Sequence, residues 1–340
     1  MPRIVRFNET GGPEVLKIED LPPDEPGEGE VRIAVAAFGL NFAETMLRRG
    51  VYIADPVFPS RIGVEAAGTI DALGPGVSGF TIGDRVGIVP AQSSDRFGNW
   101  TPESGKYGTY GESTLAPVHA VGRNPENVSD EVCAAVWCQY LTAWGALIDY
   151  AGVSGDDIVL VTAATSSAGL AGLQIAKEAG ARVIAATRTA AKKDFLADRV
   201  GADAVIVTDD EDLVRRVMEI TSGQGFTVAY DPVGGPNIAT LIAAAQPGAK
   251  IVNYGNLHAE PVNFPMLPML AKRLNLKCHS CYDTTRDAPA LARGYAYVLD
   301  RVQSGALKPV IARTFALDQI VEAHRYMEAQ THIGKIVVTT

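Results

Sequence analysis

Two patterns of apolar and polar residues divide the chain. Up to about Asn127, short β-branched runs such as VRIAVAAFG and DRVGIVP are separated by Gly and Pro, which is typical of β-strands with irregular loops. From about Val128, apolar strands alternate with helical segments, the pattern of βαβ units and a parallel sheet. The change predicts a mostly β domain over residues 1–127, followed by an α/β domain over residues 128–283.

The second region predicts six strands with helices between them. The expected strands are Asp157–Ala163, Arg182–Thr187, Ala204–Thr208, Thr227–Val233, Lys250–Tyr254 and Asn275–Tyr282. The expected helices, each with an apolar stripe at helical spacing, are Gly169–Ala179, Ala190–Val200, Glu211–Thr221, Pro236–Ala245 and Met266–Leu274. This alternation indicates an α/β fold with a doubly wound parallel sheet.

The tail after Asp283 changes pattern again. One helix, Ala288–Val302, precedes a second helical stretch and a closing strand, KIVVTT. Two helices and a strand cannot bury a core of their own. We therefore expect residues 284–340 to complete the first domain.

Composition and charge restrict the classes of function. The 340 residues are 47% hydrophobic and 20% charged, enough apolar material for two packed domains. The net charge of -9 opposes binding to nucleic acid and to anionic membrane surfaces. The first residues, MPRIVRFNETGG, do not resemble a secretory signal, and no apolar run approaches the length of a membrane span. We expect a soluble, cytoplasmic protein.

The four cysteines, Cys133, Cys138, Cys278 and Cys281, are expected to be reduced thiols in the cytoplasm. The spacing of Cys278 and Cys281 also fits a redox pair or half of a metal site, but no second CxxC occurs. If LKCHSCY is a strand, alternation places these two side chains on opposite faces. We favour buried thiols without redox or metal chemistry.

The segment between the first strand and the first helix of the α/β region consists of small residues. A pyrophosphate that approaches a helix N-terminus requires such a turn. Only the last glycine of the usual G-x-G-x-x-G pattern is present, and serine hydroxyls can replace part of the missing backbone contacts. Alone, this loop is equally consistent with an ordinary strand-helix turn. In the context of six strands it predicts cofactor contacts by Thr165, Ser166, Ser167, Ala168 and Gly169.

The end of the second strand bears on the choice of cofactor. An NAD enzyme needs an acidic residue there to bind the ribose 2′-OH, but the chain reads ATRT, followed by Lys192 and Lys193. The Arg188 guanidinium is suited to a 2′-phosphate. The alternative is a solvated helix start, although lysines near a helix N-terminus are unfavourable. We predict NADP(H), with contacts from Thr187, Arg188 and Lys192.

Several short motifs stand out along the chain. They are GLNFAE from Gly39, RGVY from Arg49, GVEAAG from Gly63, GDRV from Gly83, GTY from Gly108, LTA from Leu141 and DPVGG from Asp231. With these motifs, the chain resembles the zinc-free quinone oxidoreductase branch, ζ-crystallin-like, of the medium-chain dehydrogenase/reductase superfamily. The resemblance covers essentially the whole chain.

The resemblance implies a Rossmann cofactor domain inserted in a GroES-like substrate domain. In zinc-dependent members of the superfamily, a Cys stands at the place of Asn41 and a His at the place of Val64, both as metal ligands. An amide and an isopropyl group cannot replace them. The lobe that holds a structural zinc also lacks its cysteines, since Ser93–Gly108 contains none. We expect catalysis without a metal.

A site without a Lewis acid is better suited to reducing an electron-poor acceptor than to oxidising an alcohol. We expect NADPH-dependent hydride transfer to a quinone or a similar carbonyl acceptor, in which positioning and hydrogen-bond donors suffice. Two alternatives stay open: reduction of the C=C bond of a 2-alkenal, enone or enoyl thioester, and NADPH binding with little turnover. The sequence does not identify the physiological acceptor.

Asn41 and Tyr52 match polar cleft residues of the family. The resemblance implies that they hold the acceptor or its enolate oxygen, that Tyr52 can relay a proton, and that Asn41 also contacts the cofactor. The alternatives are a capping or turn role for Asn41 and a core or interface role for Tyr52. Glu44 stands where Asp is common, which leaves its role open.

The remaining expectations also follow from the resemblance. Thr142, Asn253, Tyr254 and Gly255 are expected near the nicotinamide, although Thr142 is equally consistent with helix packing. A homodimer is expected through the edge strand of the cofactor sheet, over Leu276–Tyr282, because an exposed apolar edge is otherwise a liability.

Overall fold

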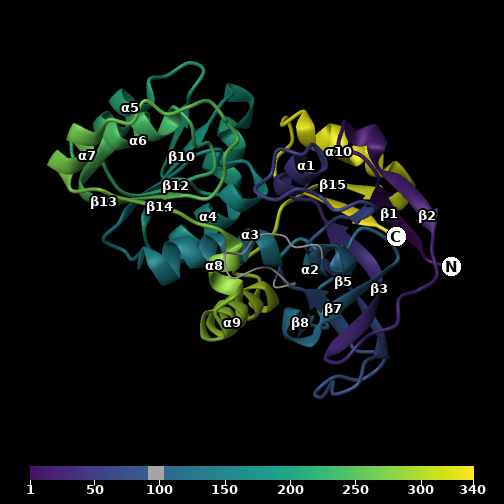
Figure 1. Cartoon of the computed structure of the whole chain (residues 1–340). Coiled ribbons are helices and arrows are strands. Elements are labelled where there is room, and N and C mark those ends of the chain that lie inside the picture. Colours follow the sequence, from purple (N-terminus) through teal and green to yellow (C-terminus); the bar gives the residue numbers. More distant parts are fainter. Residues whose placement is uncertain (91–102) are drawn as a thin grey trace.

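The computed structural model describes residues 1–90 and 103–340, which form two halves with the chain termini in the same half (Figure 1). The half without the termini is built on a parallel sheet in the order β11-β10-β9-β12-β13-β14. Its strands are β9 (Ile158–Val161), β10 (Arg182–Thr187), β11 (Ala204–Val207), β12 (Phe226–Asp231), β13 (Ala245–Asn253) and β14 (Asn275–Cys278). The order reverses between β9 and β12, where doubly wound sheets bind ligands.

Four helices connect these strands: α4 (Ser167–Glu178), α5 (Leu213–Ile220), α6 (Asn237–Ala244) and α7 (Met266–Lys272). Helix α4 lies very close to the sheet, because a Cβ on Gly172 would come within 2.6 Å of the Tyr230 ring on β12. The predicted α/β fold with a doubly wound parallel sheet is therefore confirmed.

The other half contains a seven-stranded sheet in the order β15-β16-β3-β5-β6-β8, with β7 also paired to β3. Its strands are β3 (Glu30–Gly39), β5 (Ala66–Leu73), β6 (Arg85–Ile88), β7 (Ser113–Pro117), β8 (Val121–Arg123), β15 (Ile311–Ala316) and β16 (Lys335–Thr339). A small sheet of β1 (Arg3–Phe7), β2 (Lys17–Asp20) and β4 (Ser60–Arg61) completes this half with α1 (Phe42–Arg48) and α10 (Ile320–Glu328). The C-terminal strands thus pair within the sheet that the N-terminal region begins.

Four helices lie near the middle of the molecule in Figure 1: α2 (Asp130–Cys133), α3 (Trp137–Trp144), α8 (Cys281–Thr285) and α9 (Ala288–Ser304). Trp137 of α3 stacks on Tyr295 of α9, with ring centroids 4.7 Å apart. Gly294 lets α9 approach α3, because a Cβ there would lie 2.8 Å from the Trp144 ring. These contacts hold α3 against α9.

Two predicted elements are wrong in part. The strand expected over Asn275–Tyr282 ends at Cys278, because Ser280 caps α8 and its hydroxyl accepts from the Tyr282 N–H at 3.3 Å. Cys278 is consequently exposed while Cys281 is buried, so the prediction of two buried thiols fails for Cys278. The helix expected over Ala190–Val200 is irregular, with a 3₁₀ turn at Ala190–Lys192 and a π-helical turn at Phe195–Arg199.

Most of Ser93–Gly108, where the sequence lacks the zinc-lobe cysteines, lies outside the described residues. In the part of the chain that is described, no helix has the length and apolar character of a membrane span.

Candidate active site

The turn between β9 and α4 is the segment that the sequence predicts to bind a pyrophosphate. Ser166 is the N-cap of α4, and its hydroxyl oxygen accepts from the Gly169 N–H at 3.0 Å. A Cβ on Gly169 would lie 2.6 Å from the Ala163 carbonyl oxygen, so only glycine fits at this position. Small residues therefore let the N-terminus of α4 face the space beyond the sheet edge, as a pyrophosphate requires.

A cavity of about 1050 Å³ opens at this edge, at the point where the strand order reverses. It extends from the loop at the end of β10 to Leu40, Phe42 and Lys335 of the other half. Of the predicted cofactor residues, six line it: Thr165, Ser166, Ser167, Thr187, Arg188 and Lys192. The cavity therefore connects the turn between β9 and α4 with the half of the molecule that contains the termini.

Arg188 and Lys192 place positive charge at one end of the cavity. Arg188 is exposed, and within residues 1–90 and 103–340 its guanidinium makes no hydrogen bond or ion pair. Lys192 donates to the backbone carbonyls of Gln330 and His332, at 3.3 and 3.1 Å, and burial together with Arg188 lowers its pKa. An anion bound at this end would contact the Arg188 guanidinium, which has no other partner among the described residues, and would lie near the Lys192 ammonium.

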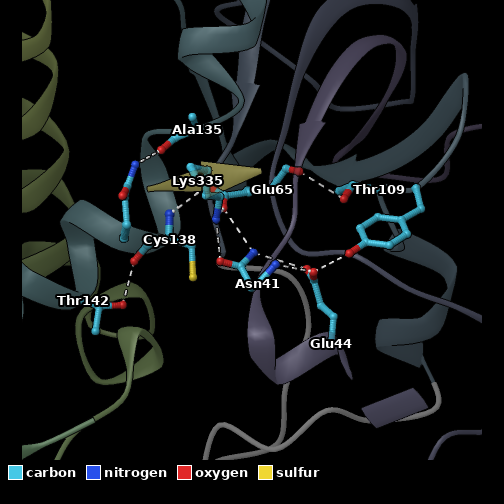
Figure 2. A network of polar contacts seen from close by, with 10 residues as sticks. Asn41, Glu44, Glu65, Thr109, Ala135, Cys138, Thr142 and Lys335 are labelled. Atoms are coloured by element: carbon cyan, nitrogen blue, oxygen red, sulfur yellow. Dashed lines mark hydrogen bonds and ion pairs between the residues drawn. The ribbon is translucent and has the colours of Figure 1, made fainter. Parts of the chain in front are cut away.

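A polar cluster lies at the other end, formed by Asn41, Glu44, Glu65 and Lys335 (Figure 2). Tyr110 belongs to it because its hydroxyl donates to Glu44. Asn41 is half-buried and the other four residues are buried. The side chains of Lys335 and Glu65 are fully buried and form an ion pair. The Lys335 ammonium also donates to Asn41 Oδ1 at 2.6 Å. Burial lowers the pKa of Lys335, but the negative groups around it, Glu65 first among them, together raise this pKa above its usual value. The cluster thus holds a permanent cation next to Asn41.

Both polar atoms of the Asn41 side-chain amide are hydrogen bonded within this cluster. Asn41 Nδ2 donates to Glu65 Oε1 at 3.1 Å and to Glu44 Oε1 at 3.3 Å, while Oδ1 accepts from Lys335. Asn41 is also the N-cap of α1, and its backbone N–H donates to Glu44 Oε2 at 2.6 Å. The capping role that the sequence left open is therefore present, and Asn41 does not line the cavity that its neighbours Leu40 and Phe42 line.

Tyr52 is half-buried, and its hydroxyl makes no hydrogen bond among the described residues. Burial is the main cause that raises its pKa well above the usual value, with smaller contributions from Cys281, Cys138 and Glu44. The phenol is therefore neutral at physiological pH, so it is able to donate a hydrogen bond or a proton. Its proposed relay role is chemically consistent with this position.

The structure does not bring the other predicted residues to the cavity surface. Thr142 donates its hydroxyl to the Cys138 carbonyl at 2.6 Å, a contact within α3 that fits helix packing. Asn253 donates to Asp231 Oδ2 at 3.0 Å. The Tyr254 ring stacks on Tyr230 with centroids 4.0 Å apart. The residues that do not line the cavity are Asn41, Tyr52, Thr142, Ala168, Gly169, Asn253, Tyr254 and Gly255.

Comparison with known proteins agrees with this arrangement. Residues 27–163 match the alcohol dehydrogenase GroES-like domain family, and residues 168–295 match the zinc-binding dehydrogenase family. The quinone oxidoreductase of Pseudomonas aeruginosa is 32% identical, over 99% of this chain and 99% of its own length. This chain belongs to the quinone oxidoreductase branch of the medium-chain dehydrogenases/reductases.

Solved structures of similar proteins cover the whole fold. Quinone oxidoreductase from Escherichia coli, complexed with NADPH, is 29% identical with a TM-score of 0.89, covering 99% of this chain and 100% of that chain. An NAD-dependent alcohol dehydrogenase is 32% identical with the same TM-score of 0.89, covering 99% of both chains. The medium-chain fold therefore occurs with either cofactor among these neighbours.

In this medium-chain reductase, the sequence did not single out Lys335, Glu65 or Asp231 as site residues. Glu65 and Asp231 stand inside the family landmarks, and Lys335 is the one charged residue of the closing apolar strand. Asp231 is fully buried and accepts from the Gly234 N–H at 2.9 Å and from Asn237 Nδ2 at 2.7 Å. The sequence did contain a signal for Lys335, because it is a charged residue within an apolar strand. A buried charge needs a partner of opposite charge, so this pattern indicates an ion pair in the core.

Glu44 makes the stability of this medium-chain reductase depend on pH. Burial raises the pKa of Glu44 from 4.5 to about 7. The hydrogen bond that the Tyr110 hydroxyl donates to Glu44 at 2.5 Å acts in the opposite direction and lowers this pKa. Between about pH 4.5 and 7 the folded state binds a proton that the unfolded state has lost. The contribution of Glu44 to the free energy of unfolding is therefore fully present below about pH 4.5 and is lost as the pH rises through about 7.

We expect Glu44→Gln to remove this loss of stability, which amounts to about 3 kcal/mol for a shift of this size. The measurement is urea denaturation of both proteins at pH 5 and pH 8. Comparison with the variant cancels groups such as His324, whose pKa burial lowers to about 3 and whose effect has the opposite sign. An equal change with pH in both proteins would contradict the assignment to Glu44.

Proposed function

We propose that this protein transfers hydride from NADPH to a quinone without zinc. The cavity carries the proposal, because it joins a phosphate-binding loop and an uncommitted Arg188 to the substrate half of the molecule. The quinone oxidoreductase relatives, one of them solved with NADPH, support both the acceptor and the cofactor. We also propose that the cavity lies between two domains, residues 1–127 with 284–340 and residues 128–283.

The residues present fit NADPH. Arg188 and Lys192 would hold the 2′-phosphate, and Thr165, Ser166 and Ser167 would face the pyrophosphate at the start of α4. When bound, the nicotinamide supplies the hydride. Tyr52 offers a neutral phenol that can donate to an acceptor oxygen as negative charge develops on it. The buried cluster around Asn41 excludes water and fixes the adjoining start of α1.

The side chains that stand at the metal position of the zinc-dependent members support operation without zinc. Asn41 and Val64 replace the Cys and His ligands of the zinc-dependent members. In addition, Lys335 donates to Asn41 Oδ1, so a cation already occupies the space next to that residue. A divalent ion there would be repelled by the ammonium.

A substrate panel tests the function and the metal independence together. We expect rapid oxidation of NADPH with benzoquinones, and a rate that treatment with a chelator leaves unchanged. Turnover of enones alone would replace quinone reduction with C=C reduction. Tight NADPH binding without turnover of either class would contradict a reductase, and a rate that zinc restores after chelation would contradict the metal-free site.

We further propose a homodimer through the edge of the cofactor sheet. β14 pairs only with β13, so its other edge is unpaired among the described strands. Large exposed apolar residues precede it: Leu257, Val262, Phe264, Met266, Leu267 and Leu270. Sedimentation velocity should show a dimer that Leu267→Glu weakens, whereas a monomeric wild-type protein would refute this assembly.

A further inference from the structure

A buried histidine directly follows the last strand of the parallel sheet. The side chain of His279 is 1% exposed. Its backbone N–H donates to the carbonyl oxygen of Asn253, the last residue of β13, at 2.8 Å. His279 therefore stands at the carboxyl edge of the sheet, beside the end of the neighbouring strand. Doubly wound sheets bind their ligands at this edge.

The His279 ring lies between oxygen atoms of two different helices. Nε2 lies 3.1 Å from the carbonyl oxygen of Thr142 on α3, and Nδ1 lies 3.2 Å from Oδ2 of Asp283 on α8. A carbonyl oxygen can only accept a hydrogen bond, so Nε2 carries a proton and donates it to Thr142. The His279 imidazole is also the main cause that lowers the pKa of Asp283, so this carboxyl is ionised at neutral pH. The ring therefore links α3 to α8.

A glycine at the end of α3 leaves space for the ring. Gly145 is the C-cap residue of α3. A Cβ at this position would lie 3.0 Å from Cε1 of His279 and 2.2 Å from Oγ1 of Thr284 on α8. A larger residue would therefore push the segment that carries His279 away from α3.

Hydrogen bonds connect His279 with the wall of the cavity. Asn253, which accepts from the His279 N–H, donates through Nδ2 to Oδ2 of the buried Asp231 at 3.0 Å. The other carboxylate oxygen of Asp231 accepts from Asn237 Nδ2 at 2.7 Å and from the Thr162 hydroxyl. Both Asn237 and Thr162 line the cavity. The contacts of His279 therefore continue across the sheet edge to the cavity surface.

The strand order indicates which part of the cofactor would lie nearest to these residues, a step that rests on the proposed function. The proposed contacts place the 2′-phosphate at Arg188, after β10, and the pyrophosphate at Ser166, after β9. The sheet continues in the order β9-β12-β13-β14. The nicotinamide end of an extended dinucleotide would therefore reach toward β12 and β13, whose carboxyl ends carry Asp231 and Asn253.

We propose that His279 is a positioning residue of the nicotinamide site. Its ring donates to the Thr142 carbonyl, and its backbone binds the end of β13, so it sets the spacing between α3 and the sheet edge. His279 does not line the cavity and acts through Thr142 and Asn253. Loss of the ring contact would displace the nicotinamide end of the site and leave the 2′-phosphate end intact.

Two ligands distinguish positioning from a general loss of structure. 2′,5′-ADP carries the 2′-phosphate but no nicotinamide, so it probes only the Arg188 end of the cavity. In His279→Asn, the amide nitrogen takes the place of Nδ1 and does not reach the Thr142 carbonyl. We expect this full-length variant to bind NADPH about tenfold more weakly and 2′,5′-ADP as tightly as the wild-type protein. Isothermal titration calorimetry measures both affinities without any acceptor.

His279→Gln is the matched variant, because its amide nitrogen takes the place of Nε2 and is still able to donate to the Thr142 carbonyl. We expect its NADPH affinity to lie within about threefold of the wild-type value. The proposal is overturned if the Gln and Asn variants bind NADPH equally. It is also overturned if His279→Asn weakens NADPH and 2′,5′-ADP by the same factor.

Hydrogen exchange in the wild-type protein gives a test that does not depend on the folding of a variant. NADPH should slow amide exchange in peptides that cover residues 275–285, whereas 2′,5′-ADP should not. Equal protection by both ligands, or by neither, would overturn the proposal. A protein that shows the expected binding and exchange but reduces no quinone would contradict the proposed function and leave the role of His279 in place. Failure to bind NADPH at all would contradict both.

Discussion

Replacing Arg188 with alanine is expected to weaken NADPH binding by about ten- to a hundredfold and to leave NADH binding unchanged. The reason is that the Arg188 guanidinium lines the cavity without a partner in the described part of the chain, so a 2′-phosphate gains a charge-assisted contact that NADH cannot make. Fluorescence titration of the purified variant with each cofactor measures both affinities.

Lys193→Ala is the matched control. Lys193 directly follows Lys192 in the sequence and is exposed, but it does not line the cavity. Its NADPH affinity should differ little from that of the wild-type protein. If Arg188→Ala weakened NADPH and NADH equally, Arg188 would not distinguish the 2′-phosphate. The preference for NADPH would then need another origin.

Replacing Lys335 with methionine is expected to destabilise the fold by about 3–5 kcal/mol, because it leaves the Glu65 carboxylate buried without its cation. Asn41 Oδ1 also loses its donor in this variant. Urea denaturation followed by circular dichroism measures the free energy of unfolding. The double variant Glu65→Gln/Lys335→Met should recover most of the loss, since both charges are then removed.

Arg215→Met provides the comparison for an exposed ion pair. Arg215 and Glu219 lie one turn apart on α5, with side-chain exposures of 60% and 44%. Pairs of this kind contribute at most about 1 kcal/mol. A loss of similar size for Lys335→Met would show that the Glu65–Lys335 pair is not what stabilises this part of the molecule.

The sequence predicted the cofactor half well, because strand periodicity and small turn residues depend on local physics. The strand Arg182–Thr187 has the predicted bounds, and Ser166 and Gly169 stand at the cap and the close contact that a phosphate loop needs. Prediction failed near Tyr282, where alternation continued past Cys278 although Ser280 had already begun a helix. A single apolar run does not distinguish a strand from a strand followed by a short helix.

The polar cluster was beyond prediction from spacing alone. Lys335 meets Glu65 and Asn41 only because β16 lies beside β3, a pairing between opposite ends of the chain. Residue patterns report which side chains are buried, but contacts between distant segments depend on how the sheets and helices are assembled.

The position of β16 has a consequence for biosynthesis. Residues Lys335–Thr339 form β16, which lies between β15 and β3 and places Lys335 in the candidate active site. The parallel sheet is complete in sequence at Cys278, so we expect that half to fold while the ribosome is still translating. The other half begins first in the sequence, but its seven-stranded sheet cannot close until β16 has been synthesised.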